Sequence, residues 1–141
     1  MLEKYRQPLL KALAEWHEKY DPEAEMIKMP FSSPGYHTTL KGGFVHPTRE
    51  SLIYALALFD QGEVELAERI IRKVLSLQDT DPRHHTYGIW PWFAEEPLCQ
   101  MAPPDWNWAD FCSQELLVIL LEHRRLLAED LQETIKSSVF H

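Results

Sequence analysis

The sequence predicts an all-α fold of antiparallel helical hairpins with two long loops. Nine of the ten prolines and four of the five glycines fall within residues 21–47 and 79–106, which leaves the rest almost free of helix breakers. Outside those stretches, apolar residues recur at steps of three and four, the period of an amphipathic helix. Alternation of polar and apolar residues is nowhere long enough to predict an extended sheet, although residues 38–45 offer a short hairpin around Gly42 and Gly43.

The first predicted helix lies before Asp21 and Pro22, where the chain is expected to leave the helical conformation. Pro8 lies inside this segment and is expected to shorten or kink the helix. The apolar stripe along one side of the helix consists of Leu2, Tyr5, Leu9, Leu13, Trp16 and Tyr20.

The second and third helices are predicted to form an antiparallel hairpin with a very short turn. Thr48 is expected to cap the second helix, which presents Leu52, Leu56 and Phe59 on one face and ends before Gly62. The third helix begins with glutamates and ends with basic residues, the order that the helix dipole favours. Its inward-facing side chains are expected to be Ala67, Ile70, Ile71, Val74 and Leu77.

Two further helices are expected, over about 107–125 and 128–139. Charge places the boundary between them, because His123 to Arg125 suit the last turn of one helix and Glu129 and Asp130 the first turn of the next. Apolar side chains surround the fourth helix on nearly all sides, which predicts an inner-layer helix that is buried all round. These side chains are Leu116, Leu117, Ile119, Leu120 and Leu121.

The composition is that of a single globular domain over residues 1–141, with 45% hydrophobic and 26% charged residues. No apolar run approaches the ~20 residues of a membrane span, and the N-terminus lacks the apolar stretch of a signal peptide, so a cytoplasmic location without membrane contact is predicted. Fourteen basic and 22 acidic residues give a net charge of −8, which argues against a nucleic-acid partner.

No metal site and no cofactor are predicted. His84 and His85 are adjacent in the sequence and cannot easily share one metal ion, and no His-Glu-x-x-His pattern is present. Gly42 and Gly43 lack the spacing of a phosphate-binding loop. Cys112 lies inside a predicted helix with no activating base evident in the sequence, which favours an inert thiol.

The two long connections, of about 27 residues each, are predicted to carry function, because packed helices are usually joined by a handful of residues. Four of the five tryptophans lie between residues 90 and 108, and residues 79–110 hold six acids against one base, Arg83. Indole faces stack on the C–H faces of sugar rings, and carboxylates accept hydrogen bonds from hydroxyls or catalyse glycosidic cleavage. The mixture therefore predicts a saccharide ligand.

The alternative interpretation of the second connection is structural. Its aromatic residues would then only pack the connection onto the helix ends, and Asp105 would only cap the following helix. The corresponding function is a non-enzymatic helical interaction or assembly module, whose apolar helix faces form the interface.

A helical hairpin, followed by residues 77–82, residues 87–92 and the motif Pro-Asp-x-Asn-x-Ala-Asp-Phe from Pro104 to Phe111, resembles the repeat units of six-hairpin glycosidase-like proteins. The resemblance covers about 48–139 and implies a partial (α/α)6 toroid of about two and a half hairpins. It also implies a glycoside hydrolase-like or polysaccharide lyase-like function at one mouth. Twelve helices with such loops need roughly 300 residues, so a homo-oligomer or the remainder of a longer parent chain is expected to complete the array.

The resemblance also implies which residues form the site. If the protein is a hydrolase, the paired carboxylates come from three candidates, whose acid and base roles the sequence does not divide: Glu95, Asp105 and Asp110. The candidates for substrate binding are Tyr87, Trp90, Trp92, Trp106, Trp108 and Glu96.

Overall fold

The computed structural model describes residues 3–140. The α-helices of this part of the chain are α1 (Glu3–Lys19), α2 (Thr48–Asp60), α3 (Val64–Leu75), α4 (Asn107–His123) and α5 (Glu129–Val139). Its strands are β1 (Tyr20–Asp21), β2 (Met26–Ile27), β3 (Met29–Ser32) and β4 (Gly42–Val45). Two short 3-10 helices, η1 (Leu98–Gln100) and η2 (Arg124–Leu126), complete it.

The prediction of an all-α, partial toroid-like array is wrong, because the fold is mixed. The strands form two small antiparallel sheets, β1 with β2 and β3 with β4. Each strand has only two to four residues, too few for alternation to be recognised in the sequence. The hairpin expected over residues 38–45 is also wrong, because Gly42–Val45 pairs with Met29–Ser32 across a longer loop.

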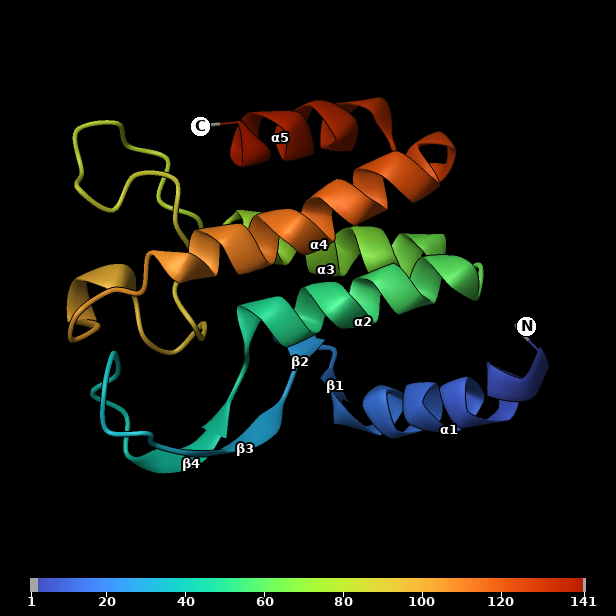
Figure 1. Ribbon diagram of the computed structural model, residues 1–141, viewed down its shortest axis with the longest axis horizontal. Coiled ribbons are helices and arrows are strands. Elements are labelled where there is room, and N and C mark those ends of the chain that lie inside the picture. The colour runs from blue at the N-terminus through green and yellow to red at the C-terminus, as the bar shows by residue number, and fades with distance from the viewer. Residues whose placement is uncertain (1–2, 141) are drawn as a thin grey trace.

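The helices α2, α3, α4 and α5 form the body of the molecule, with α4 lying between α2 and α5 (Figure 1). The predicted hairpin of α2 and α3 is confirmed. Gly62 follows the C-cap residue Gln61 with a φ of +78°, a left-handed conformation that glycine adopts without strain. Its N–H donates to the carbonyl of Phe59, which closes the last turn of α2.

The main core lies between these helices and takes in residues from outside them. Ile70, Ile71 and Val74 of α3 are fully buried, as the sequence predicted. Met26 and Ile27 of β2 are buried as well, since β2 packs against α2 and α3. The Ser51 hydroxyl of α2 accepts the N–H of Ile27 and donates to the carbonyl of Pro47, which fixes β2 to the start of α2.

The break between the last two helices is confirmed, but the complete burial expected for the fourth helix is wrong. The 3-10 helix η2 and a short turn separate α4 from α5. In α4, Leu116 and Ile119 are buried, whereas Leu121 is 73% exposed. Because α4 packs on α2 and on α5, its remaining side stays at the surface.

Helix α1 lies at the edge of the molecule, below α2 in the view of Figure 1, and its C-terminal half contacts α2. Pro8 lies inside α1 without ending it. Leu9 of the predicted stripe is 62% exposed, while Leu13 and Trp16 are half-buried against the core; Leu2 and the side chain of Tyr5 are outside the described residues. None of the helices within residues 3–140 combines the length and apolar character that a membrane crossing requires.

Candidate functional site

The two long connections meet at one end of the helices (Figure 1). An open pocket of about 660 Å³ lies between them. The β3–β4 ribbon and its loop form one wall, and the segment from Trp92 to Trp108 forms the other. We call this the aromatic pocket, after its five aromatic residues Phe31, Tyr36, Trp92, Phe93 and Trp108. Its polar side chains belong to Ser32, His37, Glu50, Asp105 and Asn107.

The first wall presents rings from the ribbon and from the loop that follows β3. Phe31 packs edge-on against Phe93 of the opposite wall, with ring centroids 4.7 Å apart. Tyr36 meets Trp92 edge-on at 6.2 Å and is 61% exposed. Tyr36 can therefore reach a ligand at the mouth of the pocket, where its ring is not needed to fill the core.

His37 is held in an unusual backbone conformation beside Tyr36. Its φ is +62°, which a residue other than glycine rarely adopts. Its carbonyl accepts the N–H of Ala102, and its Nδ1 lies 2.6 Å from the carbonyl oxygen of Pro103. A carbonyl only accepts hydrogen bonds, so we assign the proton to Nδ1, which leaves Nε2 of the neutral ring as an acceptor.

The second wall is held together by Asp105. The indole N–H of Trp92 donates to Oδ2 of Asp105 at 3.1 Å, and the backbone N–H of Asn107 donates to Oδ1 at 3.1 Å. The second bond closes a turn just before α4; the N-cap residue of that helix is Trp106, without a side-chain capping bond, so the cap expected at Asp105 is wrong. Trp92 and Trp108 lie with ring centroids 5.5 Å apart, so Asp105 orients a pair of indoles along this wall.

Thr48 anchors the second wall to α2, a different role from the predicted cap. Its side chain makes no capping hydrogen bond. Instead, its hydroxyl donates to the carbonyl of Pro91 at 2.8 Å and accepts the indole N–H of Trp108 at 2.8 Å. Its backbone N–H donates to the carbonyl of Trp92. This fully buried threonine thus fixes the position of both pocket tryptophans.

Glu50 is a second carboxylate of the pocket that the sequence reasoning missed. It lies in the first turn of α2 and is half-buried. Its sequence position suggested only an interaction with the helix dipole. The signal that could have identified it is its place two residues after Thr48, where the first long connection ends, because functional residues are concentrated in and beside long loops.

Of the nine candidates from the sequence, the structure brings Trp92, Trp108 and Asp105 together in the aromatic pocket. Trp90 instead lies fully buried in the main core, where its indole N–H donates to the carbonyl of Val74 at 3.0 Å. Tyr87, Trp106 and Asp110 are exposed and do not line the pocket.

The adjacent glutamates 95 and 96 face different partners outside the pocket. Glu96 is buried, and its Oε2 accepts the N–H and the hydroxyl of Thr39 at 2.7 and 2.6 Å. Burial alone would raise the pKa of Glu96, but these hydrogen bonds outweigh it and hold the pKa below its ordinary value. Glu96 therefore fixes the loop after β3, next to Tyr36 and His37.

Glu95 takes part in a three-residue clamp with His46 and Asp21. Nε2 of His46 lies 2.8 Å from Oδ2 of Asp21, and its Nδ1 contacts Oε1 of Glu95. Burial opposes the charged form of His46, but the two carboxylates outweigh it and raise the pKa of His46. The hydrogen bond from His46 lowers the pKa of Asp21. The clamp ties the end of β4 to both long connections.

We expect the clamp to stabilise the protein mainly at acidic and neutral pH. Because folding raises the pKa of His46, its contribution is complete below the ordinary value of about 6.5 and is lost as the pH rises through the folded value. The measurement is the free energy of unfolding against pH for the wild type and for His46→Gln. Their difference should shrink as the pH rises, whereas His85→Gln, at an exposed histidine, should show no such trend; a constant difference would exclude a charged clamp.

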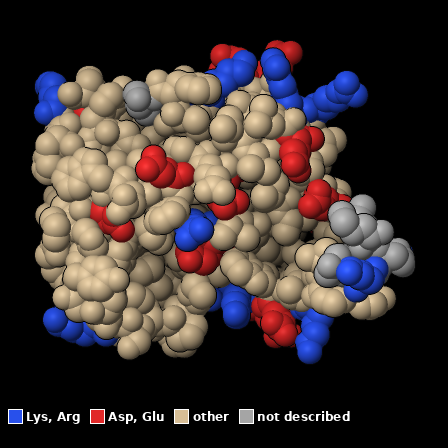
Figure 2. Space-filling view, in the orientation of Figure 1, with Lys and Arg blue, Asp and Glu red and all other residues tan. Residues whose placement is uncertain are grey.

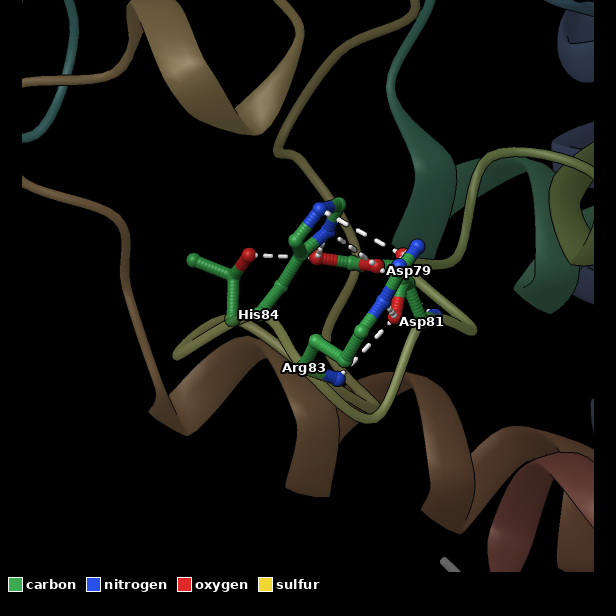
Figure 3. Close-up of polar contacts among 5 residues, drawn as sticks. Asp79, Asp81, Arg83 and His84 are labelled. Atoms are coloured by element: carbon green, nitrogen blue, oxygen red, sulfur yellow. Dashed lines mark hydrogen bonds and ion pairs between the residues drawn. The ribbon is translucent and has the colours of Figure 1, made fainter.

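The charged side chains of residues 79–86 are engaged with one another (Figure 3). Nδ1 of His84 lies 3.0 Å from Oδ2 of Asp79, and Arg83 pairs with Asp81 at 2.7 Å. Asp79 also accepts the hydroxyl of Thr86. Within the described chain, no group of three or more His, Cys, Asp and Glu side chains is placed to hold a metal ion. These contacts brace the start of the second connection.

Two other features bear on the chemistry available at the surface and in the core. On the face seen in Figure 2, basic and acidic side chains are interspersed and do not form a large patch of one sign.

In the core, burial raises the pKa of Cys112 to about 12, so this thiol stays protonated and unreactive at neutral pH.

Comparison with known proteins identifies one family model, described as Domain of unknown function (DUF8769), which matches residues 9–141. No curated protein and no solved structure matches the chain. The resemblance to six-hairpin glycosidase-like proteins, which none of these findings tests, stays a prediction.

Proposed function

The chain belongs to the DUF8769 family, and we propose that it is a saccharide-binding domain whose ligand lies in the aromatic pocket. The family description specifies no activity, so the proposal depends on the pocket itself.

The observation that carries the proposal is the convergence of aromatic rings and hydrogen-bonding groups on one cavity. Sugar rings offer apolar C–H faces to aromatic side chains and hydroxyls to carboxylate, amide and imidazole groups. The aromatic pocket supplies both, with Tyr36 and Trp108 among the rings and Glu50 and Asn107 among the polar groups. Its volume of about 660 Å³ lies within the ~300–1,000 Å³ of small-molecule sites.

We propose binding in preference to cleavage because of where the carboxylates lie. Glycosidic cleavage uses two carboxyl groups that flank the scissile bond, about 5–9.5 Å apart. Of the three candidates for that role, only Asp105 lines the pocket, and both of its oxygens already accept hydrogen bonds, so the other carboxylate of the pocket, Glu50, has no free carboxylate to act with it. Glu95 is engaged by His46, and Asp110 is exposed outside the pocket.

Tyr36→Ala is expected to weaken saccharide binding about two- to tenfold, because one ring at the mouth contributes roughly 0.5–1.5 kcal/mol of stacking. The measurement is the quenching or shift of tryptophan fluorescence on titration with a panel of neutral, amino and acidic oligosaccharides. Trp92 and Trp108 would report the ligand directly, because their indoles line the pocket. The free energy of unfolding should change little, since Tyr36 is exposed.

Trp106→Ala is the matched control, because Trp106 belongs to the same connection and is 50% exposed but lies outside the pocket. The Trp106→Ala variant should bind the oligosaccharides that the wild type binds with the same affinity as the wild type. Loss of binding in Trp106→Ala with retention in Tyr36→Ala would place the ligand elsewhere. A flat titration of the wild-type protein across the whole panel would refute the proposed function.

A further inference from the structure

We infer that the aromatic pocket selects saccharides that carry a protonated amine, and that Glu50 is the counter-ion of that amine. This inference rests on the proposed function and specifies its ligand class.

The first argument is the charge of the pocket lining. Glu50 and Asp105 line the aromatic pocket, whereas none of its described lining residues is a lysine or an arginine. Carboxylates are anionic at neutral pH. A uronic acid would therefore meet two like charges and no cation, which disfavours binding, whereas an ammonium group would meet charges of opposite sign.

The second argument is that the carboxylate of Glu50 is available. Within residues 3–140, no hydrogen bond or ion pair engages it, in contrast to Asp105, whose two oxygens accept from Trp92 and Asn107. The adjacent basic residue, Arg49, places its guanidinium 4.5 Å from the ring centroid of Phe111, which does not line the pocket. Glu50 thus lines the cavity with a carboxylate that no described hydrogen bond or ion pair engages.

The third argument is that the other groups of the pocket suit the same ligand. Tryptophan and tyrosine rings attract cations within about 6 Å through the negative potential of their faces, in addition to stacking on sugar C–H groups. The side-chain amide of Asn107, which also lines the pocket, offers an acceptor oxygen. An ammonium group with three donors would find an anion, an acceptor and aromatic faces in one cavity.

The test compares β-1,4-linked oligosaccharides of equal length that differ at carbon 2: glucosamine, N-acetylglucosamine and glucose, with an oligouronate as the acidic ligand. Affinities are measured calorimetrically at pH 6, where the amine is protonated. We expect the glucosamine oligomer to bind about tenfold more tightly than the glucose oligomer, as a charge-assisted hydrogen bond provides. The oligouronate should bind most weakly.

Glu50→Gln should lower the glucosamine affinity more than the glucose affinity and so abolish the preference for the glucosamine oligomer, because glutamine keeps hydrogen-bonding atoms but loses the charge. Glu65→Gln is the control, because Glu65 also lies in the first turn of a helix but outside the pocket; it should keep the full preference. Unfolding curves of both variants establish that they are folded.

The outcomes separate this inference from the proposed function. Equal binding of the glucosamine and glucose oligomers would overturn the inference and leave saccharide binding intact. An unchanged preference in Glu50→Gln would overturn the assignment of the counter-ion. If no oligosaccharide binds, the proposed function fails and the inference fails with it.

Discussion

Replacing Trp90 by alanine is expected to lower the free energy of unfolding by about 3–5 kcal/mol, the range for tryptophan or phenylalanine truncation in a core. Trp90 is fully buried in the main core, so the substitution leaves a large cavity. It also removes the indole N–H that donates to the carbonyl of Val74 at 3.0 Å, which leaves that carbonyl without this partner. Chemical denaturation at neutral pH measures the difference.

Trp90→Phe isolates most of the packing contribution. It loses the hydrogen bond to Val74, as the alanine variant does, but it keeps an aromatic ring and leaves a smaller cavity. Its destabilisation should be clearly smaller than that of the alanine variant. Trp106→Ala provides the control for removing a tryptophan from the same connection, and at 50% exposure it should change the unfolding free energy little. Equal destabilisation by Trp90→Ala and Trp106→Ala would contradict the packing of Trp90 in the core.

Trp90 also shows where sequence reasoning about the site reached its limit. Trp90 and Trp92 are separated by a single proline and belong to the same aromatic segment. Only the fold distinguishes them: Trp90 packs in the main core, and Trp92 lines the pocket. Residues 76–106 contain no α-helix or strand in the structure, so no periodicity was available to assign a direction to each side chain.

The helices were predictable because each is defined by local signals that agree. The hydrophobic stripe of α3 and the glycine at position 62 predicted the hairpin, and the charge reversal around Arg124 and Glu129 predicted the break before α5. The strands were not predictable, because a pair such as Met26 and Ile27 is stabilised by its contact with α2 and α3 and not by local propensity. Burial of α4 depended likewise on which neighbours cover it.

The part of the site in the second connection was predictable from the sequence, and the part in the first connection and α2 was not. The unusual length of both connections identified the regions that meet at the pocket, and composition identified Trp92, Trp108 and Asp105 in one of them. Tyr36 and Glu50 lie in the other connection and in the helix that follows it, where no concentration of aromatic or acidic residues marked them. Their role depends on the pairing of β3 with β4, which brings that loop to the second connection.

The second large effect is expected at Thr48, whose hydroxyl joins the pocket wall to α2. Thr48→Val keeps the shape of the side chain but removes the donor to Pro91 and the acceptor of the Trp108 indole N–H. Leaving buried polar groups without partners should lower the free energy of unfolding by about 1–3 kcal/mol. Because Trp108 loses its anchor, saccharide affinity should also fall about tenfold, on the assumption that positioning of that ring is worth about 1.4 kcal/mol.

Ser51→Ala tests whether the loss of affinity is specific to the pocket wall. Ser51 is also buried in α2, and its hydroxyl likewise joins two partners, the N–H of Ile27 and the carbonyl of Pro47. The alanine variant should therefore lose a similar stability, but it should keep the affinity for oligosaccharides because it leaves both pocket tryptophans anchored. If both variants bind as the wild type does, the Thr48 hydroxyl does not position Trp108 for the ligand. If both lose affinity in proportion to stability, binding reports the general integrity of α2 and not the geometry of the wall.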